Sequence, residues 1–244
     1  MRLKNKRIVI TGASRGLGRA MAIRFAQEGA SLALCARSGE LLNRLSLELS
    51  LGGTKTVATS CDISEPEQVE RFASNVLEEL GGIDVLVNNA AQLGPRIDLA
   101  DWTAASWSRI IEVNVNGLFH VTKAFLPSML GADSGSIINV SSSVGKQGKK
   151  RWGAYAISKF AMEGFTQTLA DEVRTAHIRV NSVNPGPLDT EMRHAAYPEE
   201  DRSRLKSPAE VLEVFVYLAS DESRLTTGQY FDAQTYKQKE KEIS

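Results

Sequence analysis

Short apolar runs that alternate with longer helical patterns place the strongest constraint on how this 244-residue chain can fold. Runs typical of strands lie at residues 8–10, 31–36, 54–60, 85–87, 136–140, 178–183 and 229–232. Helical patterns lie at residues 15–29, 39–51, 64–80, 103–130, 152–175 and 208–219. Apolar strands separated by helices are typical of a parallel sheet that is covered on both faces. The sequence therefore predicts an α/β fold, a Rossmann-type doubly wound parallel sheet of about seven strands with helices on both faces.

Two expected helix boundaries depend on single residues. Ser64, followed three residues later by Glu67, predicts a helix that begins with Ser64 as its N-cap. Pro127 predicts a kink or an end in the long helix over 103–130, because proline has no N–H to donate. No linker, repeat or low-complexity segment interrupts the pattern, so we expect a single domain over residues 1–236 and a charged, frayed tail over 237–244.

Composition narrows the class of partner. Lys and Arg together number 29, as do Asp and Glu, so net charge gives no reason to expect nucleic acid or a membrane surface as partner. No apolar stretch has the length of a transmembrane helix or of a signal peptide's apolar region. Cys35 and Cys61 lie near the ends of apolar runs and are expected to be buried and reduced, as in a cytoplasmic protein. His120, His177 and His194 lack the spacing of metal ligands, and we predict no metal site.

A glycine-rich turn separates the first strand from the first helix. Gly12, Gly16 and Gly18 lie in the stretch Thr-Gly-x3-Gly-x-Gly. Glycines at such a turn let the backbone approach a pyrophosphate, which then faces the N-terminus of the helix. The spacing differs from the common Gly-x-Gly-x2-Gly fingerprint, and a purely structural turn is the alternative. The position of the turn favours dinucleotide binding.

The end of the second strand distinguishes the two nicotinamide dinucleotides. A carboxylate about twenty residues after the glycines would bind the adenosine ribose and favour NAD(H). Here the strand ends in Cys35-Ala36-Arg37-Ser38, which contains no carboxylate. Arg15 and Arg37 are cations that can hold a 2′-phosphate, although solvated surface arginines are the alternative. The sequence therefore favours NADP(H) over NAD(H).

Tyr155 and Lys159 are four residues apart in a stretch that has helical periodicity. This spacing places the phenol and the ammonium group on one face of the helix, one above the other. On most helices such a pair is part of an amphipathic rim with a solvated lysine. The pair is therefore weak evidence for catalysis when it is considered alone.

Motifs distributed along nearly the whole chain make the pair more specific. They are the glycine-rich loop at 11–18, Asp62-Ile63, Asn88-Asn89-Ala90, Asn114, Ser142 thirteen residues before Tyr155, and Pro185-Gly186 with Thr190. In their order and spacing these motifs resemble the short-chain dehydrogenase/reductase family, in the branch whose chains have about this length. The resemblance extends to members that act as NADP-dependent 3-oxoacyl-carrier-protein reductases.

The resemblance implies a catalytic group and a cofactor-binding set. The catalytic group would be Ser142, Tyr155, Lys159 and Asn114, with Asn114 holding a water that connects Lys159 to solvent. The cofactor-binding set would comprise Gly12, Ser14, Arg15, Gly16, Leu17, Gly18, Arg37, Asp62, Ile63, Asn89, Ala90, Tyr155, Lys159, Pro185, Gly186, Leu188 and Thr190. Ala91 stands where the family usually has glycine, which would cost roughly 1 kcal/mol if that position required a positive φ.

Elementary electrostatics suggests how the pair could act. A tyrosine has an unperturbed pKa of about 10, which makes it a poor proton donor or acceptor near neutral pH. A lysine cation at about 4 Å would stabilise the phenolate by roughly 4 kcal/mol. We therefore predict that Lys159 lowers the pKa of Tyr155, so that Tyr155 acts as general acid/base while hydride passes between NADP(H) and a carbonyl or secondary alcohol. Ser142 would donate a hydrogen bond to the substrate oxygen.

The motifs define a class of substrate and not one compound. A small ketone or a 3-oxoacyl compound is the preferred substrate class. A sugar or polyol dehydrogenase that works oxidatively and a non-catalytic dinucleotide-binding sensor are the alternatives. Lys146, Lys149, Lys150 and Arg151 form a basic cluster that either attracts an anionic substrate or is a solvated loop. Residues 193–207 are expected to form a mobile flap over the site, and the resemblance implies a homo-oligomer.

Overall fold

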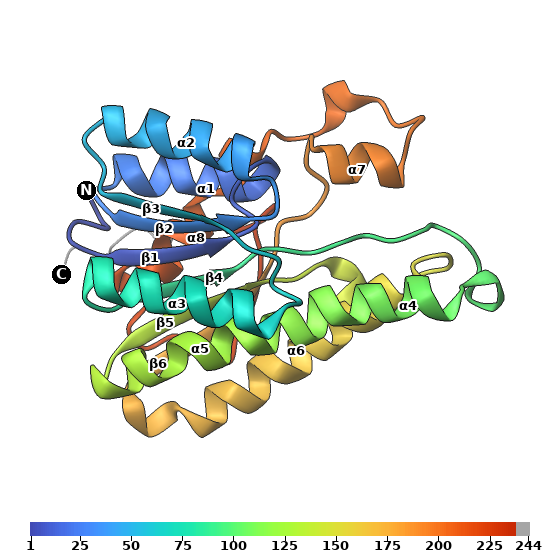
Figure 1. Ribbon diagram of the computed structural model, residues 1–244. Coiled ribbons are helices and arrows are strands. Elements are labelled where there is room, and N and C mark those ends of the chain that lie inside the picture. The colour runs from blue at the N-terminus through green and yellow to red at the C-terminus, as the bar shows by residue number, and fades with distance from the viewer. Residues whose placement is uncertain (238–244) are drawn as a thin grey trace.

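Seven parallel strands form the centre of the computed structural model, which describes residues 1–237 (Figure 1). In chain order they are β1 (Arg7–Thr11), β2 (Ser31–Ala36), β3 (Thr56–Ser60), β4 (Val85–Asn88), β5 (Gly135–Val140), β6 (Ile178–Asn184) and β7 (Tyr230–Asp232). Their order in the sheet is β3-β2-β1-β4-β5-β6-β7, and every neighbouring pair is parallel. This arrangement confirms the doubly wound Rossmann-type sheet, whose strand order reverses between β1 and β4.

Helices cover both faces of the sheet (Figure 1). One face packs against α1 (Gly16–Gln27), α2 (Gly39–Leu51) and α8 (Glu213–Ala219). The other packs against α3 (Pro66–Leu80), α5 (Gly117–Gly131) and α6 (Gly153–Glu172), with α4 (Ala104–Ile111) extending beyond the sheet. The alternation of side chains along a strand explains the continuous apolar runs. In β1, Ile8 and Ile10 join one apolar cluster and Val9 joins the other, so both faces of the strand are buried.

Two predicted boundaries are wrong. Helix α3 begins at Pro66, with Glu65 at the N-cap position, because proline suits the first turn of a helix. The Ser64 hydroxyl instead donates to the Asp62 carboxylate at 2.7 Å. Pro127 does not end the long helix either, because α5 continues past it to Gly131, and the alternative of a kink at Pro127 stays a prediction.

The interruption in that long helical stretch occurs earlier than Pro127. A π-helix over Glu112–Asn116 joins α4 to α5 and contains Asn114. Such single-turn π segments are frequent at functional sites. The predicted helix over 208–219 is also divided, into a 3₁₀ turn (Pro208–Val211) followed by α8. The predicted frayed tail lies almost entirely outside the described residues, and the assignment of residues 1–236 to one domain stays a prediction.

The loops that follow the strands lie at one edge of the sheet, on the right of Figure 1. Ligands of open α/β sheets bind at this carboxyl edge. The short helix α7 (Glu191–Ala196) stands over it, away from the sheet layers (Figure 1). Within residues 1–237, no helix is long and apolar enough to cross a membrane.

Candidate active site

A cavity of about 1490 Å³ opens at the carboxyl edge of the sheet. Pockets for one small ligand usually measure roughly 300–1,000 Å³, so this cavity has room for a dinucleotide and a second molecule. All seventeen residues predicted to bind the cofactor lie on its wall, and so does Ser142. Asn114 is the one predicted site residue that does not.

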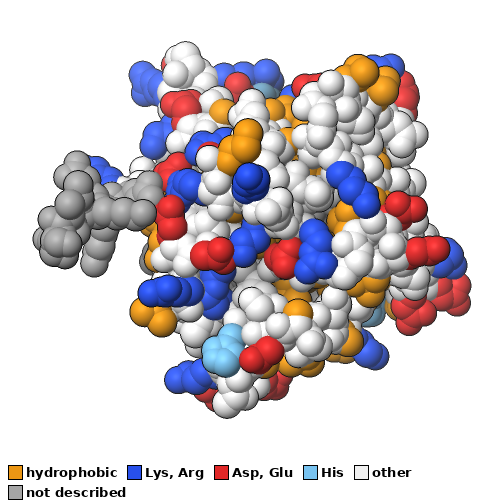
Figure 2. All heavy atoms as spheres, turned by 90° about the vertical axis from the view of Figure 1, so that its left-hand side faces the viewer, with side chains coloured by type: hydrophobic (Ala, Val, Ile, Leu, Met, Phe, Trp, Pro, Cys, Tyr) orange, Lys and Arg blue, Asp and Glu red, His pale blue; other side chains and the backbone are white. Residues whose placement is uncertain are grey.

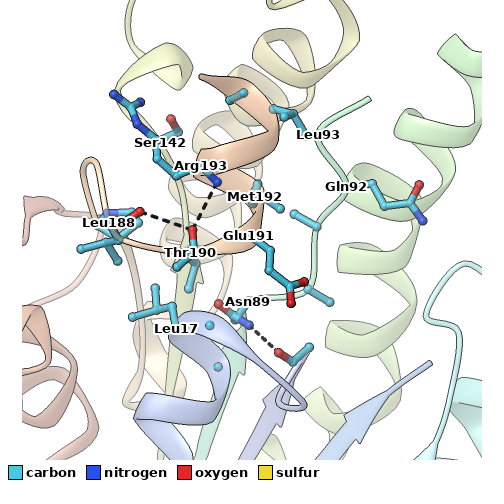
Figure 3. Close-up of a pocket in the computed structure, with 18 of the residues that line it drawn as sticks. Leu17, Asn89, Gln92, Leu93, Ser142, Leu188, Thr190, Glu191, Met192 and Arg193 are labelled. Carbon is cyan, nitrogen blue, oxygen red and sulfur yellow. Dashed lines mark hydrogen bonds between the residues drawn. The ribbon is translucent and has the colours of Figure 1, made fainter. Parts of the chain in front are cut away.

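The loop between β1 and α1 needs its glycines for steric reasons. Gly12 and Gly16 have φ values of +66° and +54°, where only glycine is unstrained. A Cβ atom on Gly18 would lie 2.2 Å from the carbonyl oxygen of Gly12. The side-chain amide of Asn89, a residue labelled in Figure 3, donates to the carbonyl oxygens of Thr11, at 2.9 Å, and Gly12, at 3.1 Å, and thereby holds the loop in place.

The N-terminus of α1 lies directly after this loop, and Leu17 in its first turn faces the cavity (Figure 3). Arg15, the N-cap residue, makes no capping hydrogen bond with its side chain. The first N–H groups of a helix have no partner within the helix, so an anion can accept from them. The loop and the helix start therefore fit the diphosphate of a dinucleotide.

The two predicted phosphate-binding arginines differ in their surroundings. Arg37 is exposed at the end of β2 and makes no ion pair within residues 1–237. Arg15 makes an ion pair with Glu191, the first residue of α7. Both members of that pair are mostly exposed, so the pair is weak. Arg37 is thus the better placed of the two cations to hold an additional phosphate.

Asp62 follows β3 and lines the cavity, where it is part of a polar cluster. Its carboxylate accepts from Arg109 at 2.6 Å and from the Ser64 hydroxyl. Burial alone would raise the pKa of Asp62, but the hydrogen bonds from Arg109 and Ser64 outweigh burial, and the net effect is a lowered pKa. Asp62 is therefore an anion at neutral pH, fixed in orientation by α4.

Ser142, Tyr155 and Lys159 lie together on the cavity wall. Tyr155 and Lys159 are on α6, and their exposed fractions are 6% and 2%. Ser142 follows β5, and its side chain is hydrogen-bonded to that of Tyr155. The Lys159 ammonium group donates to the carbonyl oxygen of Val140 at 2.6 Å and lies 5.6 Å from the centroid of the Tyr155 ring.

The acid–base properties of this group correct the prediction made from the sequence. Burial raises the pKa of Tyr155 to about 12, against the opposing hydrogen bond with Ser142. Burial also lowers the pKa of Lys159 to about 8, against the attraction of the Glu163 charge. The predicted net lowering of the Tyr155 pKa is therefore wrong for this structure, because burial outweighs any stabilisation of the phenolate by the Lys159 charge. Both side chains are desolvated, and the ammonium group is directed at a backbone carbonyl instead of at the phenol.

Asn114 is buried in the π-helix and fully engaged with its neighbours. Its amide donates to the carbonyl oxygen of Gln92 at 2.9 Å and to the Ser158 hydroxyl at 3.0 Å, and its side-chain oxygen accepts from the Gln92 N–H. The Ser158 hydroxyl in turn donates to the carbonyl oxygen of Tyr155. Asn114 therefore connects the loop after β4 to the helix that carries Tyr155, and both of its donors are in use. Its role in holding a water stays a prediction.

The basic cluster between Ser142 and Tyr155 is not one surface. Lys146 makes an ion pair with Glu163 at 3.2 Å, and Lys150 makes one with Asp98 at 3.7 Å. Lys149 donates to the Tyr197 hydroxyl at 3.2 Å and is the one member of the cluster that lines the cavity. Of the two alternatives for this cluster, attraction of an anion by all four cations together is disfavoured by these positions, and a role of Lys149 alone stays a hypothesis.

An arginine that the sequence analysis missed packs beside the cavity. The Arg96 guanidinium lies 4.4 Å from the ring centroid of Trp152 and 4.7 Å from that of Tyr197. It also donates to the carbonyl oxygen of Ala196 at the end of α7. These contacts join three segments distant in sequence, so no local spacing could have indicated them.

Helix α7 forms one side of the cavity. Thr190 is its N-cap: the Thr190 hydroxyl accepts from the Arg193 N–H at 3.3 Å and donates to the carbonyl oxygen of Leu188 at 3.4 Å (Figure 3). Gln92 and Leu93 line the cavity from the loop after β4 (Figure 3). The predicted flap over 193–207 thus begins inside α7.

The loop after β4 accommodates Ala91 without strain. Within residues 1–237, the residues other than glycine that have a positive φ are Asn5, Asp133, Arg151 and His177. Ala91 is not among them, so the alanine carries no penalty of the kind that a positive φ would impose. The departure from the family pattern therefore leaves the loop geometry intact.

The fold and the cavity agree with comparisons to known proteins. The model of the short chain dehydrogenase family matches residues 6–201, and the chain belongs to this family of oxidoreductases. The oxidoreductase YciK of Escherichia coli K12 is 38% identical over 235 residues, which is 95% of this chain and 93% of that protein. The 3-oxoacyl-[acyl-carrier-protein] reductase FabG of Thermotoga maritima is 38% identical over 237 residues, which is 94% of this chain and 96% of that protein. A short chain dehydrogenase of Shigella flexneri 2a, solved in complex with NADP, superposes with a TM-score of 0.91 at 38% identity over 96% of this chain and 99% of that chain.

Proposed function

We propose that this protein is an NADPH-dependent reductase that transfers hydride to the carbonyl carbon of a small ketone or a 3-oxoacyl compound. The observation that carries the proposal is a single cavity whose wall contains the glycine-rich loop, Arg37 and the Ser142, Tyr155 and Lys159 group. The complex of the Shigella flexneri relative with NADP and the activity named for the Thermotoga maritima relative support it.

The cavity residues fit NADP(H) from end to end. The β1–α1 loop and the N-terminus of α1 would hold the diphosphate, and Arg37 would hold the 2′-phosphate. No carboxylate stands at the end of β2, where it would repel that phosphate. Asp62 and Ile63 would flank the adenine, and Leu188 with Thr190 would contact the nicotinamide end.

The acid–base properties of Tyr155 favour the reductive direction. NADPH would supply the hydride, and the carbonyl oxygen then needs a proton. With a pKa of about 12, Tyr155 is a protonated donor at neutral pH. Lys159, with a pKa of about 8, is mostly an ammonium ion at pH 7 and stabilises the phenolate that forms when Tyr155 gives up its proton. Ser142 would donate to the same substrate oxygen and stabilise its developing charge. An oxidative polyol dehydrogenase would instead need Tyr155 as a phenolate at the start.

The charges beside the cavity favour an anionic carbonyl substrate. Lys149 and Arg96 make no ion pair with an acidic residue of the described chain, although both contact Tyr197. Such cations raise the local concentration of an anion. We expect Lys149→Gln to raise KM for a carboxylated ketone about threefold to tenfold at low salt, with little change for a neutral ketone of similar size. Equal changes for both ketones would refute the anionic preference.

The first test is a fluorescence titration of NADPH and NADH with the wild-type protein and with Arg37→Asp. We expect NADPH to bind at least tenfold more tightly than NADH and the preference to be lost in the variant. Arg44→Asp is the matched control, because Arg44 is an exposed arginine of α2 that does not line the cavity. This control should leave the preference unchanged.

A carbonyl screen with NADPH then tests turnover. Tighter binding of NADH would contradict the cofactor assignment and favour the oxidative alternative. Tight NADPH binding with no turnover of any carbonyl would favour the non-catalytic sensor. A cytoplasmic location and a homo-oligomer remain predictions, which fractionation and light scattering can check.

A further inference from the structure

A buried carboxylate lies one helical turn after Lys159. Glu163 is on α6, and its exposed fraction is 5%. Its two oxygens accept hydrogen bonds from the Ser141 hydroxyl and, at 2.9 Å, from the Ser182 hydroxyl. The ammonium group of Lys146 makes an ion pair with the same carboxylate at 3.2 Å. A buried charge is costly unless it is paired and hydrogen-bonded, and Glu163 meets both conditions.

These partners connect Glu163 to the end of β5. Ser141 directly precedes Ser142, and its N–H donates to the carbonyl oxygen of Val183 at 2.8 Å. Val140, the residue before Ser141, provides the carbonyl oxygen that accepts a hydrogen bond from the Lys159 ammonium group. Glu163 thus binds the short segment that places both Ser142 and the acceptor for Lys159.

Glu163 also acts on Lys159 through its charge. Residues four apart on a helix lie on the same face, so the carboxylate and the ammonium group are neighbours. Burial lowers the pKa of Lys159 to about 8, and the charge of Glu163 opposes that shift. Lys146 is the nearest cation to Glu163 and partly neutralises its charge.

The other charged groups on elements packed against α6 have different partners or positions. Arg109 of α4 binds Asp62, and Arg179 of β6 donates to the carbonyl oxygen of Leu218. Glu112 of the π-helix is exposed. On β7, Tyr230 lies under the Lys146 ammonium group, and Asp232 accepts from the Asn184 amide. Among these charged groups, Glu163 is therefore the one whose charge acts most directly on Lys159.

We propose that Glu163 is a positioning residue of the active site, which fixes the end of β5 that bears Ser142 and keeps Lys159 in its ammonium form. This inference rests on the proposed function only in its expected effect on kcat. Its electrostatic part concerns the protonation of Lys159, which is measurable without turnover.

The test compares Glu163→Gln with Lys146→Gln in the full-length protein. Glutamine keeps the shape of Glu163 without the charge, so the titration midpoint of Lys159 should fall by about one pH unit. Lys146→Gln leaves the carboxylate without its cation, so the midpoint should rise by a smaller amount. The readout is NMR of ¹⁵N-lysine side chains, with the Lys159 signal identified by its loss in Lys159→Met. Circular dichroism checks that each variant is folded.

The two variants shift the midpoint in opposite directions only if the charge of Glu163 acts on Lys159. Equal midpoints in all three proteins, or shifts in the same direction, would overturn the inference. If Glu163→Gln does not fold, an unchanged or lowered midpoint in Lys146→Gln still contradicts the proposal, because loss of the cation on the carboxylate should raise the midpoint.

Kinetics with NADPH separates this inference from the proposed function. The pH at which kcat is lost on the alkaline side should move with the Lys159 midpoint, and kcat should change more than KM. Midpoints that shift as expected in a protein that reduces no carbonyl would refute the proposed function and leave the electrostatic role of Glu163 standing. Midpoints that shift while the kcat profile does not would refute the catalytic consequence.

Discussion

The two edges of the sheet use their charged residues differently. At the amino edge, which faces the viewer in Figure 2, Lys and Arg side chains are interspersed with Asp and Glu side chains. The ion pairs there join Arg2 to Glu213 and Glu222, Lys6 to Asp221, and Arg7 to Asp84. At the carboxyl edge the charges are mixed: Arg15 pairs with Glu191 and Arg193 with Glu200, whereas Arg37, Arg96 and Lys149 make no ion pair with an acidic residue of the described chain.

The backbone at the carboxyl edge also has features that suit a bound ligand. The carboxyl edge contains Gly12, Gly16 and Gly186 with positive φ, all on the wall of the cavity. A Cβ atom on Gly186 would lie 2.3 Å from Cγ of Gln234, so this turn also requires glycine. The comparison shows that ion pairs occur at both edges, and that Arg37, Arg96 and Lys149 at the carboxyl edge stay without an acidic partner within residues 1–237, where an anionic ligand would bind. Substitutions at the two edges test this difference.

Removal of the Tyr155 hydroxyl should have the largest effect. We expect Tyr155→Phe to reduce kcat about 10³-fold, because the carbonyl oxygen loses its proton donor. NADPH affinity and thermal stability should stay near the wild-type values. Stopped-flow absorbance of NADPH measures the rate. Tyr217→Phe, which removes a hydroxyl bonded to Thr226 outside the cavity, is the control and should retain activity. A Tyr155→Phe protein with near-normal kcat would refute the assigned role.

A methyl group in the glycine-rich loop should have the next largest effect. In Gly18→Ala the new Cβ meets the carbonyl oxygen of Gly12, a backbone atom that cannot move without distorting the loop. We expect NADPH affinity to fall at least a hundredfold and the unfolding free energy to fall by about 1–3 kcal/mol. Calorimetric titration and denaturant unfolding measure the two quantities. Gly131→Ala is the control, because a Cβ there meets open space, and it should lower neither the NADPH affinity nor the free energy of unfolding.

Asp84→Asn tests the closed amino edge. Burial alone would raise the pKa of Asp84, but hydrogen bonds from the Arg7 side chain and backbone outweigh it and lower the pKa. A carboxyl with a lowered pKa stabilises the fold above its unfolded pKa of about 3.9, and this stability is lost as the pH falls through the folded value. We expect Asp84→Asn to lower the free energy of unfolding by about 1–2 kcal/mol at pH 7. The difference from the wild type should shrink below pH 4, and kcat should not change.

Urea unfolding at several pH values measures this effect. Asp171→Asn is the control, because Asp171 makes only an exposed ion pair with Arg174 and its loss should cost about 0.5 kcal/mol or less. A penalty for Asp84→Asn that stays constant down to pH 2 would show that the charge of Asp84 is not its source.

The smallest effect is expected at the exposed ion pair between Arg15 and Glu191. In Glu191→Gln, Arg15 is released to interact with a phosphate, so NADPH should bind about twofold to threefold more tightly at low salt. The difference should vanish at high salt. Weaker binding in the variant would mean that the contact between α7 and the loop assists binding instead of competing with it. Titrations at two ionic strengths distinguish these outcomes.

Local signals explain why the residues predicted to bind the cofactor line one cavity. The glycine-rich loop, the strand end at Arg37 and the Pro185-Gly186 turn each lie where a strand of the parallel sheet ends. Because parallel strands end at the same edge, the strand assignments alone bring such residues together. All seventeen predicted cofactor residues therefore lie on one cavity wall.

The failures have a different physical origin. Lys146 and Lys150 are close to Lys149 in sequence, but each is bound by a carboxylate from another element, Glu163 or Asp98. The direction of the Tyr155 shift was wrong because burial, which depends on all packed neighbours, exceeds the effect of one lysine. Helix boundaries at Ser64 and Pro127 failed because competing partners and tertiary packing override local preferences.

The sheet, the glycine-rich loop and most of the residues around the cavity can be predicted from the sequence alone. These features depend on the periodicity of apolar side chains and on short motifs at strand ends, which are local properties of the chain. The tertiary structure is needed for the protonation of Tyr155 and Lys159, for the partner of each lysine in the basic cluster, and for the burial of Glu163 beside Lys159. Desolvation and charge pairing depend on which distant segments meet, and that information is contained in the packed fold.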